Sequence, residues 1–233
     1  MTVAPTTLVL VRHGESNVTV NRTIGGRRTC SGLSDLGRRQ AAQLAARLES
    51  TGEFDGAALV SSDFRRAIET AELIGPAFSG SPPVIDPGFG EHDPGPDIDG
   101  MTFDEYVERY GVPDWSGDPN QVVFPGGETL AEFHLRVAGA LEAVLAARPG
   151  GTVVISCHGG VVDATFRQLL RTPSSGGFEL HTVNTSITEF RMVPASDGRD
   201  DTTVADTWRL IRYNDAAHLA GLPIETPRSA AVS

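Results

Sequence analysis

The sequence predicts an α/β fold: an open, mostly parallel sheet flanked by helices on both faces, with an irregular cap insertion. Short apolar runs rich in β-branched residues alternate with segments in which apolar residues recur at helical spacing. One long stretch crowded with Pro, Gly and Asp interrupts this alternation. Because crossovers between parallel strands are right-handed, we expect the carboxyl ends of the strands to share one edge of the sheet. Ligands bind at that edge in folds of this class.

The first unit is a strand, a polar loop and a helix. Residues 7–11 are apolar and β-branched, which predicts a buried strand. Residues 17–33 are polar and contain several glycines, which indicates a loop. Ser34 is a typical N-cap, and apolar residues recur on one face of a helix predicted to run to about residue 49.

A second unit precedes the insertion. Residues 57–61 predict another buried strand, and residues 63–78 predict a helix with alanine and isoleucine spaced inward. From about residue 80 to 127 the chain is crowded with Pro, Gly and Asp, and only residues 103–110 have helical spacing. Such a stretch usually covers a site and contributes little to the main core, so we interpret it as the cap insertion.

The third unit has the strongest patterns. A helix is predicted from about residue 128 to 147, with Thr129 and Glu132 as its capping box. Residues 152–157 form the most β-branched run of the chain and predict a buried strand. Helical spacing resumes over residues 161–170.

The end of the chain predicts two more strands. Residues 187–193 and 207–213 alternate as strands do, and an acidic loop over 195–206 joins them. Residues 223–233 resemble a loose tail. The length of 233 residues fits one domain, spanning 1–233 and carrying the insertion.

Charge and composition narrow the classes of ligand and partner. A formal charge of −11 disfavours nucleic acid and anionic membranes as partners. No apolar run approaches the roughly 20 residues of a membrane span, and no secretory signal is visible, so the expected location is cytoplasmic. Cys30 and Cys157 are too few for a disulfide framework or a thiolate zinc site, and we expect no metal or other cofactor.

Basic and titratable residues gather where the predicted strands end. Arg12 and His13 follow the first strand, Arg65 and Arg66 come just past the second, and His158 follows the strand over 152–157. A phosphoryl group fits such a set, because arginine offers a planar fork to phosphate oxygens and neutralises charge in the transition state. A neutral histidine can act as the nucleophile, and a separate acid must then protonate the leaving oxygen.

Four blocks of the sequence resemble, in order, the signature of the histidine phosphatase superfamily, the phosphoglycerate mutase-like group. They are residues 10–16 (LVRHGES), 33–37 (LSDLG), 61–67 (SSDFRRA) and 157–160 (CHGG). One RHG tripeptide would be weak support, whereas four ordered blocks at strand and helix boundaries are specific. The resemblance spans most of the chain and implies the mostly parallel sheet of that group and a phosphatase of its phosphatase branch.

The resemblance also implies roles for five residues. His13 is expected to be the phosphorylated nucleophile, and Arg12 and Arg66 to clamp the phosphate. His158 is expected to be the second histidine that contacts it. Glu91 matches the family's proton donor, which protonates the leaving oxygen and then activates water.

The sequence departs from the family's pattern after Glu91. Gly95 follows four residues later, as in the family, but residues 96–100 lack the usual aromatic residue and are one residue longer. Asp93 is therefore a second candidate for the proton donor. Of the two neighbouring arginines, we assign the phosphate to the one directly before alanine and interpret Arg65 as part of a solvated helix turn.

Further contacts to the substrate are expected around the phosphate. Thr19 stands where the family commonly has an asparagine, and Asn17 or Asn21 is expected to supply another hydrogen bond. Gly159 can present a backbone N–H at the start of a helix, where the dipole favours phosphate. Asn184 resembles a residue near the family's active site, and a cap at the start of the strand is the alternative interpretation.

The aromatic residues of the insertion have two interpretations. Phe103, Trp115 and Phe124 can shape a wall of the substrate site, or they can only anchor the insertion.

Three functions are compatible with these observations. The leading one is a metal-independent phosphomonoester hydrolase acting on a small phosphorylated metabolite through a phosphohistidine. A phosphoglycerate mutase is the second, although Arg109 is the one basic residue between positions 95 and 127 to anchor a phosphorylated carboxylate. The third is a phospho-ligand binding module with little turnover. The acidic insertion disfavours a bulky polyanion as substrate, and the fold is compatible with a homodimer.

Overall fold

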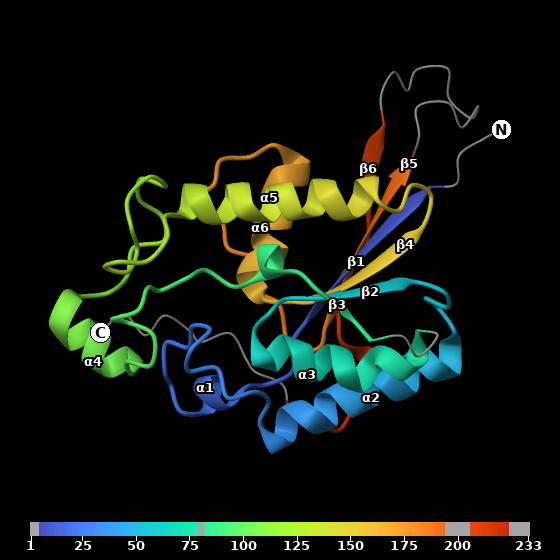
Figure 1. Ribbon diagram of the computed structural model, residues 1–233, viewed down its shortest axis with the longest axis horizontal. Helices are drawn as coiled ribbons and strands as arrows, with labels where there is room; N and C mark the ends of the chain where they lie inside the picture. Colours follow the sequence, from blue (N-terminus) through green and yellow to red (C-terminus); the bar gives the residue numbers. More distant parts are fainter. Residues whose placement is uncertain (1–4, 79–81, 194–205, 224–233) are drawn as a thin grey trace.

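A six-stranded sheet with helices on both faces forms the centre of the molecule, as the sequence predicts (Figure 1). The computed structural model describes residues 5–78, 82–193 and 206–223. The strand order is β3-β2-β4-β1-β5-β6. The strands are β1 (Thr6–Arg12), β2 (Ala58–Ser61), β3 (Val84–Ile85), β4 (Thr152–Cys157), β5 (Ile187–Val193) and β6 (Thr207–Asp215).

The pairing of the strands explains why the site residues converge. Strand β4 lies between β1 and β2 and pairs with both in parallel, whereas β5 pairs antiparallel with β1 and with β6. Arg12 is directly opposite Cys157 in this register, and Ser61 is opposite Ser156. The carboxyl ends of β1, β2 and β4 therefore meet at one edge of the sheet.

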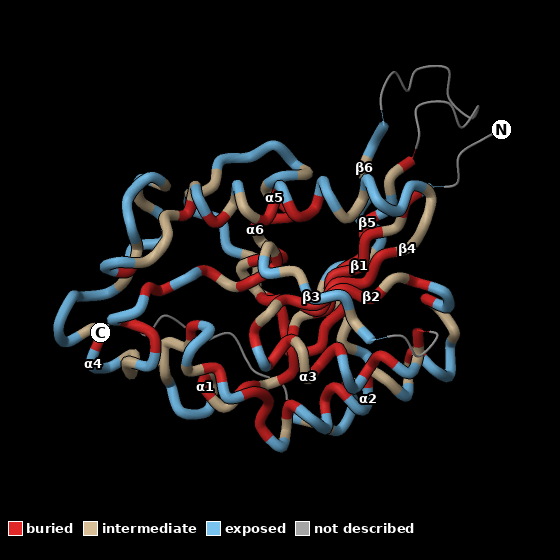
Figure 2. Tube along the Cα trace, in the orientation of Figure 1, coloured by how far each residue is buried: buried red, intermediate tan, exposed pale blue. Residues whose placement is uncertain are grey.

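The alternating side chains of the central strands pack against helices on opposite faces. Leu8 and Leu10 of β1 pack in one core cluster with residues of α5 (Leu130–Ala146) and α6 (Gly159–Leu170). Val9 and Val11 pack in a second cluster with residues of α2 (Asp35–Thr51) and α3 (Arg65–Ile74). Figure 1 shows the two helix layers, and Figure 2 shows that the buried residues concentrate along the strands between them.

The helix starts agree with the predicted caps. Ser34 accepts a hydrogen bond from the Gly37 N–H, and Thr129 and Glu132 form the predicted capping box of α5. The helix predicted over 63–78 is shorter: α3 ends at Ile74, and the chain continues as a 3₁₀ turn, η1 (Gly75–Ala77). Pro76 lies in that turn and cannot continue an α-helix, because it lacks the N–H donor.

The insertion has a small core of its own. The helix α4 (Phe103–Tyr110) has the bounds that the sequence predicts, and Tyr106 packs with Ile98 and Phe124 in a cluster separate from the two main ones. The strand β3 and the 3₁₀ turn η2 (Pro87–Phe89) were not predicted. Both residues of β3 are exposed, so the segment has no apolar alternation to reveal it.

Two other differences concern short segments. The loop expected over 17–33 begins with a four-residue helix, α1 (Asn17–Val20), and a 3₁₀ turn, η3 (Ala217–Leu219), follows β6. The predicted acidic loop and tail lie outside the described residues, apart from Asp206 and Pro223. Within the described ranges, no helix has both the length and the apolar character needed to cross a membrane.

Candidate active site

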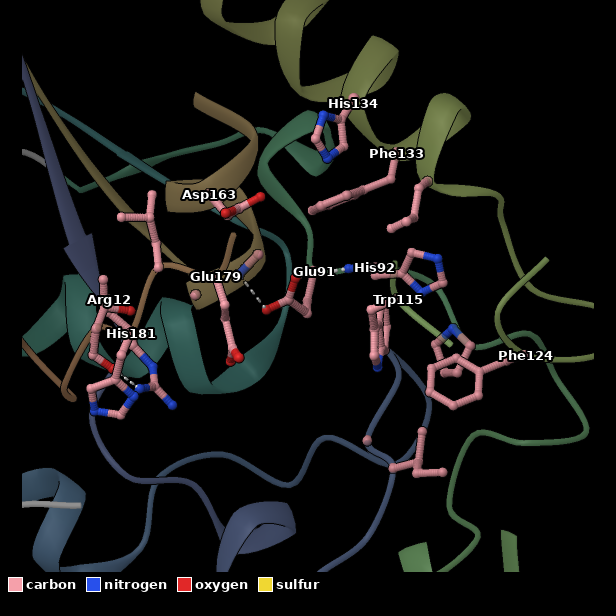
Figure 3. Close-up of a pocket in the computed structure, with 18 of the residues that line it drawn as sticks. Arg12, Glu91, His92, Trp115, Phe124, Phe133, His134, Asp163, Glu179 and His181 are labelled. Atoms are coloured by element: carbon pink, nitrogen blue, oxygen red, sulfur yellow. Dashed lines mark hydrogen bonds between the residues drawn. The ribbon is translucent and has the colours of Figure 1, made fainter. Parts of the chain in front are cut away.

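A cavity of about 810 Å³ opens at the carboxyl edge of the sheet. The cavity has two parts, which differ in the residues that line them. The histidine end is lined by Arg12, His13, Arg66, Glu91 and Gly159, and the aromatic end by His92, Trp115, Phe124 and Phe133. Glu91 lies between Arg12 and the aromatic end (Figure 3).

His13 follows β1 and is almost completely buried. Its Nδ1 lies 2.6 Å from the Gly14 carbonyl oxygen, which can only accept, so Nδ1 carries the proton and Nε2 keeps its lone pair. Burial, and then the charges of Arg66 and Arg12, lower the pKa of His13 well below its usual value. The ring is therefore neutral at pH 7, and its Nε2 is unprotonated.

The turn after His13 requires a residue without a side chain. A Cβ on Gly14 would lie 2.5 Å from the Gly37 carbonyl oxygen, closer than real Cβ contacts allow. The Gly14 N–H donates to the Thr70 hydroxyl at 3.1 Å. The start of α2 and the middle of α3 thus fix the loop that positions His13.

Arg66, on the first turn of α3, joins the two histidines. Its Nε lies 3.1 Å from His13 Nε2 and 3.3 Å from His158 Nδ1. Its Nη1 donates to the Gly25 carbonyl at 3.2 Å, and the guanidinium lies over the Phe64 ring at 4.6 Å. This cation is buried among acceptors that carry no negative charge, an arrangement that favours an anion beside it.

His158 follows β4 and is fully buried. Because its Nδ1 accepts from Arg66, its Nε2–H donates to Ser62 Oγ, 2.8 Å away. Burial, and then the charge of Arg66, lower the pKa of His158 well below its usual value. Ser62 accepts this hydrogen bond and helps to orient the ring, a role that our sequence reasoning missed although the residue stands in the block over 61–67.

Arg12, the last residue of β1, lines the same end of the cavity. Its Nη1 donates to the Thr182 carbonyl oxygen, so the segment before β5 holds the guanidinium in place. With Arg66, it brings two positive charges to the neutral His13 ring.

Glu91 is held over the cavity by main-chain donors. One of its carboxylate oxygens accepts from the Gly160 N–H at 3.2 Å, and the other from the His92 N–H at 3.0 Å. Arg136 of α5 fixes this loop, because it donates to the carbonyl oxygens of Gly90 and Glu91 at 3.0 and 3.2 Å. Arg136 carries no motif signal, and our sequence reasoning missed it.

Asp93, the alternative proton donor, lies away from the cavity. It is exposed, and its carboxylate accepts from the Gly95 N–H at 2.9 Å within its own turn. Asp93 does not line the cavity that His13 and Glu91 share. Of the two carboxylates, Glu91 and not Asp93 therefore shares a cavity with His13.

The structure brings together only some of the expected substrate contacts. Thr19 and Gly159 line the cavity. Asn17 instead donates to the Ser31 hydroxyl at 3.3 Å, outside the cavity lining. Asn184 is buried, and its amide donates to the His13 carbonyl oxygen at 2.9 Å. We correct the expectation for these two asparagines, because packing and hydrogen bonds direct their side chains away from the cavity.

The other residues singled out in the sequence also divide into those that line the cavity and those that do not. Asn21 is exposed and does not line the cavity, and neither does Phe103, whereas Trp115 and Phe124 do. Cys157 is fully buried in the core, as expected for a small apolar residue. Among the described residues, no group of three or more His, Cys, Asp or Glu side chains is placed to hold a metal ion.

Comparisons with known proteins agree with the four sequence blocks. The family model for the histidine phosphatase superfamily (branch 1) matches residues 8–199. An uncharacterized phosphatase, PhoE of Bacillus subtilis, is 32% identical over 216 residues, which cover 93% of this chain and 98% of that protein. A probable phosphoglycerate mutase, GpmB of Cronobacter sakazakii, is 30% identical over 214 residues, covering 90% and 93% of the two chains.

A solved structure has the same fold. The mycobacterial glucosyl-3-phosphoglycerate phosphatase Rv2419c, described as a complex with VO3, superposes with a TM-score of 0.70 at 26% identity. The match covers 90% of this chain and 99% of the other. The family match, the two relatives and the arrangement around His13 lead to one conclusion: this chain is a member of the histidine phosphatase superfamily.

Proposed function

We propose that this protein is a metal-independent phosphomonoester hydrolase that works through a phosphohistidine at His13. One observation carries the proposal: the unprotonated Nε2 of His13 lies 3.1 Å from the Arg66 guanidinium, in a cavity that Glu91 also lines. A nucleophile, a phosphate-binding cation and a carboxylic acid are the three parts that phosphoryl transfer to histidine needs. The proposed substrate is a small phosphorylated metabolite.

In the first step, His13 Nε2 attacks phosphorus. The P–N bond forms as the P–O bond to the leaving group breaks, and Arg12 and Arg66 neutralise charge on the phosphoryl oxygens. The neutral ring supplies its lone pair without first losing a proton, since Nδ1–H stays on the Gly14 carbonyl. The protonated carboxyl of Glu91 donates its proton to the leaving oxygen, and the alcohol departs.

The second step regenerates the enzyme. The Glu91 carboxylate takes a proton from water, whose oxygen attacks phosphorus as the P–N bond breaks. Inorganic phosphate leaves, and His13 returns to its neutral tautomer. The backbone N–H of Gly160 is 3.2 Å from Glu91 and holds the carboxylate in place for both proton transfers.

Hydrolysis fits this cavity better than mutase chemistry does. A mutase must retain its substrate while the phosphoryl group is returned, which calls for a cation to hold the carboxylate of phosphoglycerate. Arg109, the basic residue of the insertion, does not line the cavity, and its guanidinium instead lies 5.6 Å from the Tyr110 ring centre. The binding-module alternative leaves the position of Glu91 unexplained, because a ligand carrying negative charge gains nothing from a carboxylate beside it.

The proposal is tested by phosphate release from a panel of phosphomonoesters in EDTA, with wild type and His13→Ala side by side. We expect turnover by wild type that chelation does not change, and a loss of at least about 10⁴-fold in His13→Ala, as for removal of other nucleophiles. Quenched wild type should carry an acid-labile phosphoenzyme that the variant lacks. Turnover that survives in His13→Ala, or isomerisation of 3-phosphoglycerate faster than its hydrolysis, would overturn the proposal.

A further inference from the structure

One ring at the aromatic end of the cavity is exposed enough to contact a ligand. Trp115 is 45% exposed, whereas Phe124 and Phe133 are 6% and 3% exposed. The Trp115 ring packs edge-to-face on His92 at 5.2 Å and on Phe124 at 5.5 Å between centroids. Trp115 is therefore an open aromatic surface supported from behind by buried rings, and it lines the same cavity as His13.

The supporting rings are apolar in character and uncharged. His92 is buried, and burial lowers its pKa, with partial compensation from Glu128 and Glu91. Neither of its ring nitrogens has a hydrogen-bond partner at acceptable geometry. His92 packs against Phe133 at 5.7 Å and so behaves as a third neutral ring behind Trp115.

Among the described lining residues, the arginine that could otherwise bind a substrate carboxylate already has partners within the protein. Beyond the two arginines of the histidine end, Arg167 is the remaining arginine or lysine among the described lining residues. Its Nε donates to Asp163 at 2.5 Å, and its two terminal nitrogens donate to the carbonyl oxygens of Pro173 and Phe178 at 2.9 and 2.6 Å. Glu179 also lines the cavity and adds negative charge. A second anionic group on the substrate would find no uncommitted cation here.

We propose that the aromatic end is a leaving-group subsite that binds a neutral, planar ring on the Trp115 surface. The preferred substrates are then phosphomonoesters of ring-bearing, uncharged alcohols, in preference to phosphorylated carboxylates. Within the histidine end, Glu91 lies on the side toward the aromatic end, between Arg12 and Trp115 (Figure 3), so an alcohol oxygen that receives its proton directs the rest of the leaving group toward Trp115. This inference rests on the proposed hydrolase function and adds a substrate class to it.

Two substrates that differ by one ring test the subsite. Ethyl phosphate and 2-phenylethyl phosphate have similar leaving oxygens, so their kcat/KM ratio reports what the ring contributes. We expect 2-phenylethyl phosphate to be favoured by about tenfold or more, the size of effect that burying and stacking one ring gives. We expect 3-phosphoglycerate to have a kcat/KM at least about tenfold below that of 2-phenylethyl phosphate, as for a charge left without its partner.

Variants of matched aromatic residues separate a subsite from a general effect of the insertion. Trp115→Ala should lower the phenylethyl-to-ethyl ratio by about tenfold, and Trp115→Phe should restore most of it. Tyr110 is a suitable control, because it is 43% exposed, belongs to the same insertion and does not line the cavity. Tyr110→Ala should leave the ratio as in wild type.

The possible failures are distinguishable. A wild-type ratio near one, with turnover that depends on His13, overturns the aromatic subsite and leaves the hydrolase function intact. A ratio that falls equally in Trp115→Ala and Tyr110→Ala also overturns it, since the effect would then belong to the fold of the insertion. Absence of His13-dependent turnover with every substrate counts against the proposed function itself.

Discussion

The two ends of the cavity are built differently. At the histidine end, main-chain groups hold the side chains: Gly14 holds His13, Gly25 holds Arg66, and Gly160 holds Glu91. At the aromatic end, side chains support one another, and Trp115 rests on the rings of His92 and Phe124. One end is part of the sheet edge, and the other belongs mostly to the insertion.

From this difference we expect the two ends of the cavity to serve different functions. Contacts to backbone carbonyls and N–H groups depend on the path of the chain, which the core of the sheet determines. Contacts between side chains of an insertion change with each substitution and leave that path intact. We therefore expect substitutions at the aromatic end to change substrate preference while the reaction at the histidine end is retained.

Arg66→Lys should produce the largest loss among residues other than the nucleophile. The guanidinium contacts both histidines and the Gly25 carbonyl, and one ammonium group cannot make these contacts together. Loss of a transition-state arginine costs about 10³-fold or more in kcat. Arg65→Lys is the matched control, because Arg65 is half-exposed and pairs with Glu69 on the outside of the helix. Equal losses in the two variants would show that the helix start, and not the guanidinium in the cavity, matters.

Glu91→Gln should lower kcat by about 10²-fold or more, the usual contribution of a general acid. The amide retains the shape of the side chain and cannot donate the proton. Asp93→Asn is the control two residues away, with its carboxylate bound in its own turn, and it should retain most of the activity. Steady-state rates with ethyl phosphate measure both variants. A greater loss in Asp93→Asn would move the proton donor to that residue.

The histidine end was predictable because its residues stand at strand ends. Patterns over β1 and β4 were strong enough to fix the edge of the sheet, and the family's blocks then selected Arg66 over Arg65. In the structure Arg66 is 5% exposed and contacts His13, whereas Arg65 is half-exposed and pairs with Glu69. Local patterns sufficed here because the backbone itself positions these side chains.

The remaining parts of the site depend on contacts between distant segments. Asn184 and Asn17 were expected in the cavity, but the direction of each amide is decided by packing with residues far away in sequence or across a loop. Arg167 lines the cavity without any sequence signal, and its contacts to Asp163 and two carbonyl oxygens show that it is committed. No periodicity encodes such contacts, so sequence patterns did not reveal them.

The pH dependence of stability should also differ between the two ends. Burial and arginine charges depress the pKa of His13 and His158 in the folded state. Below about pH 6.5 the unfolded chain takes up protons that the folded rings do not, so stability is retained above this pH and lost as the pH falls below it. Between pH 7 and 5.5 the free energy of unfolding falls by about 1 kcal/mol for each ring that stays neutral.

Thermal unfolding of variants isolates these contributions. His13→Gln should flatten the decline in Tm between pH 7 and 5.5. His92→Gln, at the aromatic end, should flatten it less, because nearby Glu128 and Glu91 partly offset the effect of burial on the pKa of His92. Identical slopes in wild type and His13→Gln would contradict a neutral His13 in the folded protein.

Binding of inorganic phosphate should have the smallest effect on stability. It is also the most direct test of the comparison, because phosphate can occupy the histidine end and has no leaving group to occupy the aromatic end. Phosphate at a concentration equal to its Kd stabilises the folded state by about 0.4 kcal/mol, or about 1–2 °C in Tm for a chain of this size. Trp115→Ala should retain that shift, whereas Arg66→Lys should lose most of it, because the phosphate oxygens meet Arg66 and never reach Trp115. A shift abolished by Trp115→Ala would mean that the insertion orders the histidine end, and chemistry and specificity would then be properties of one coupled site.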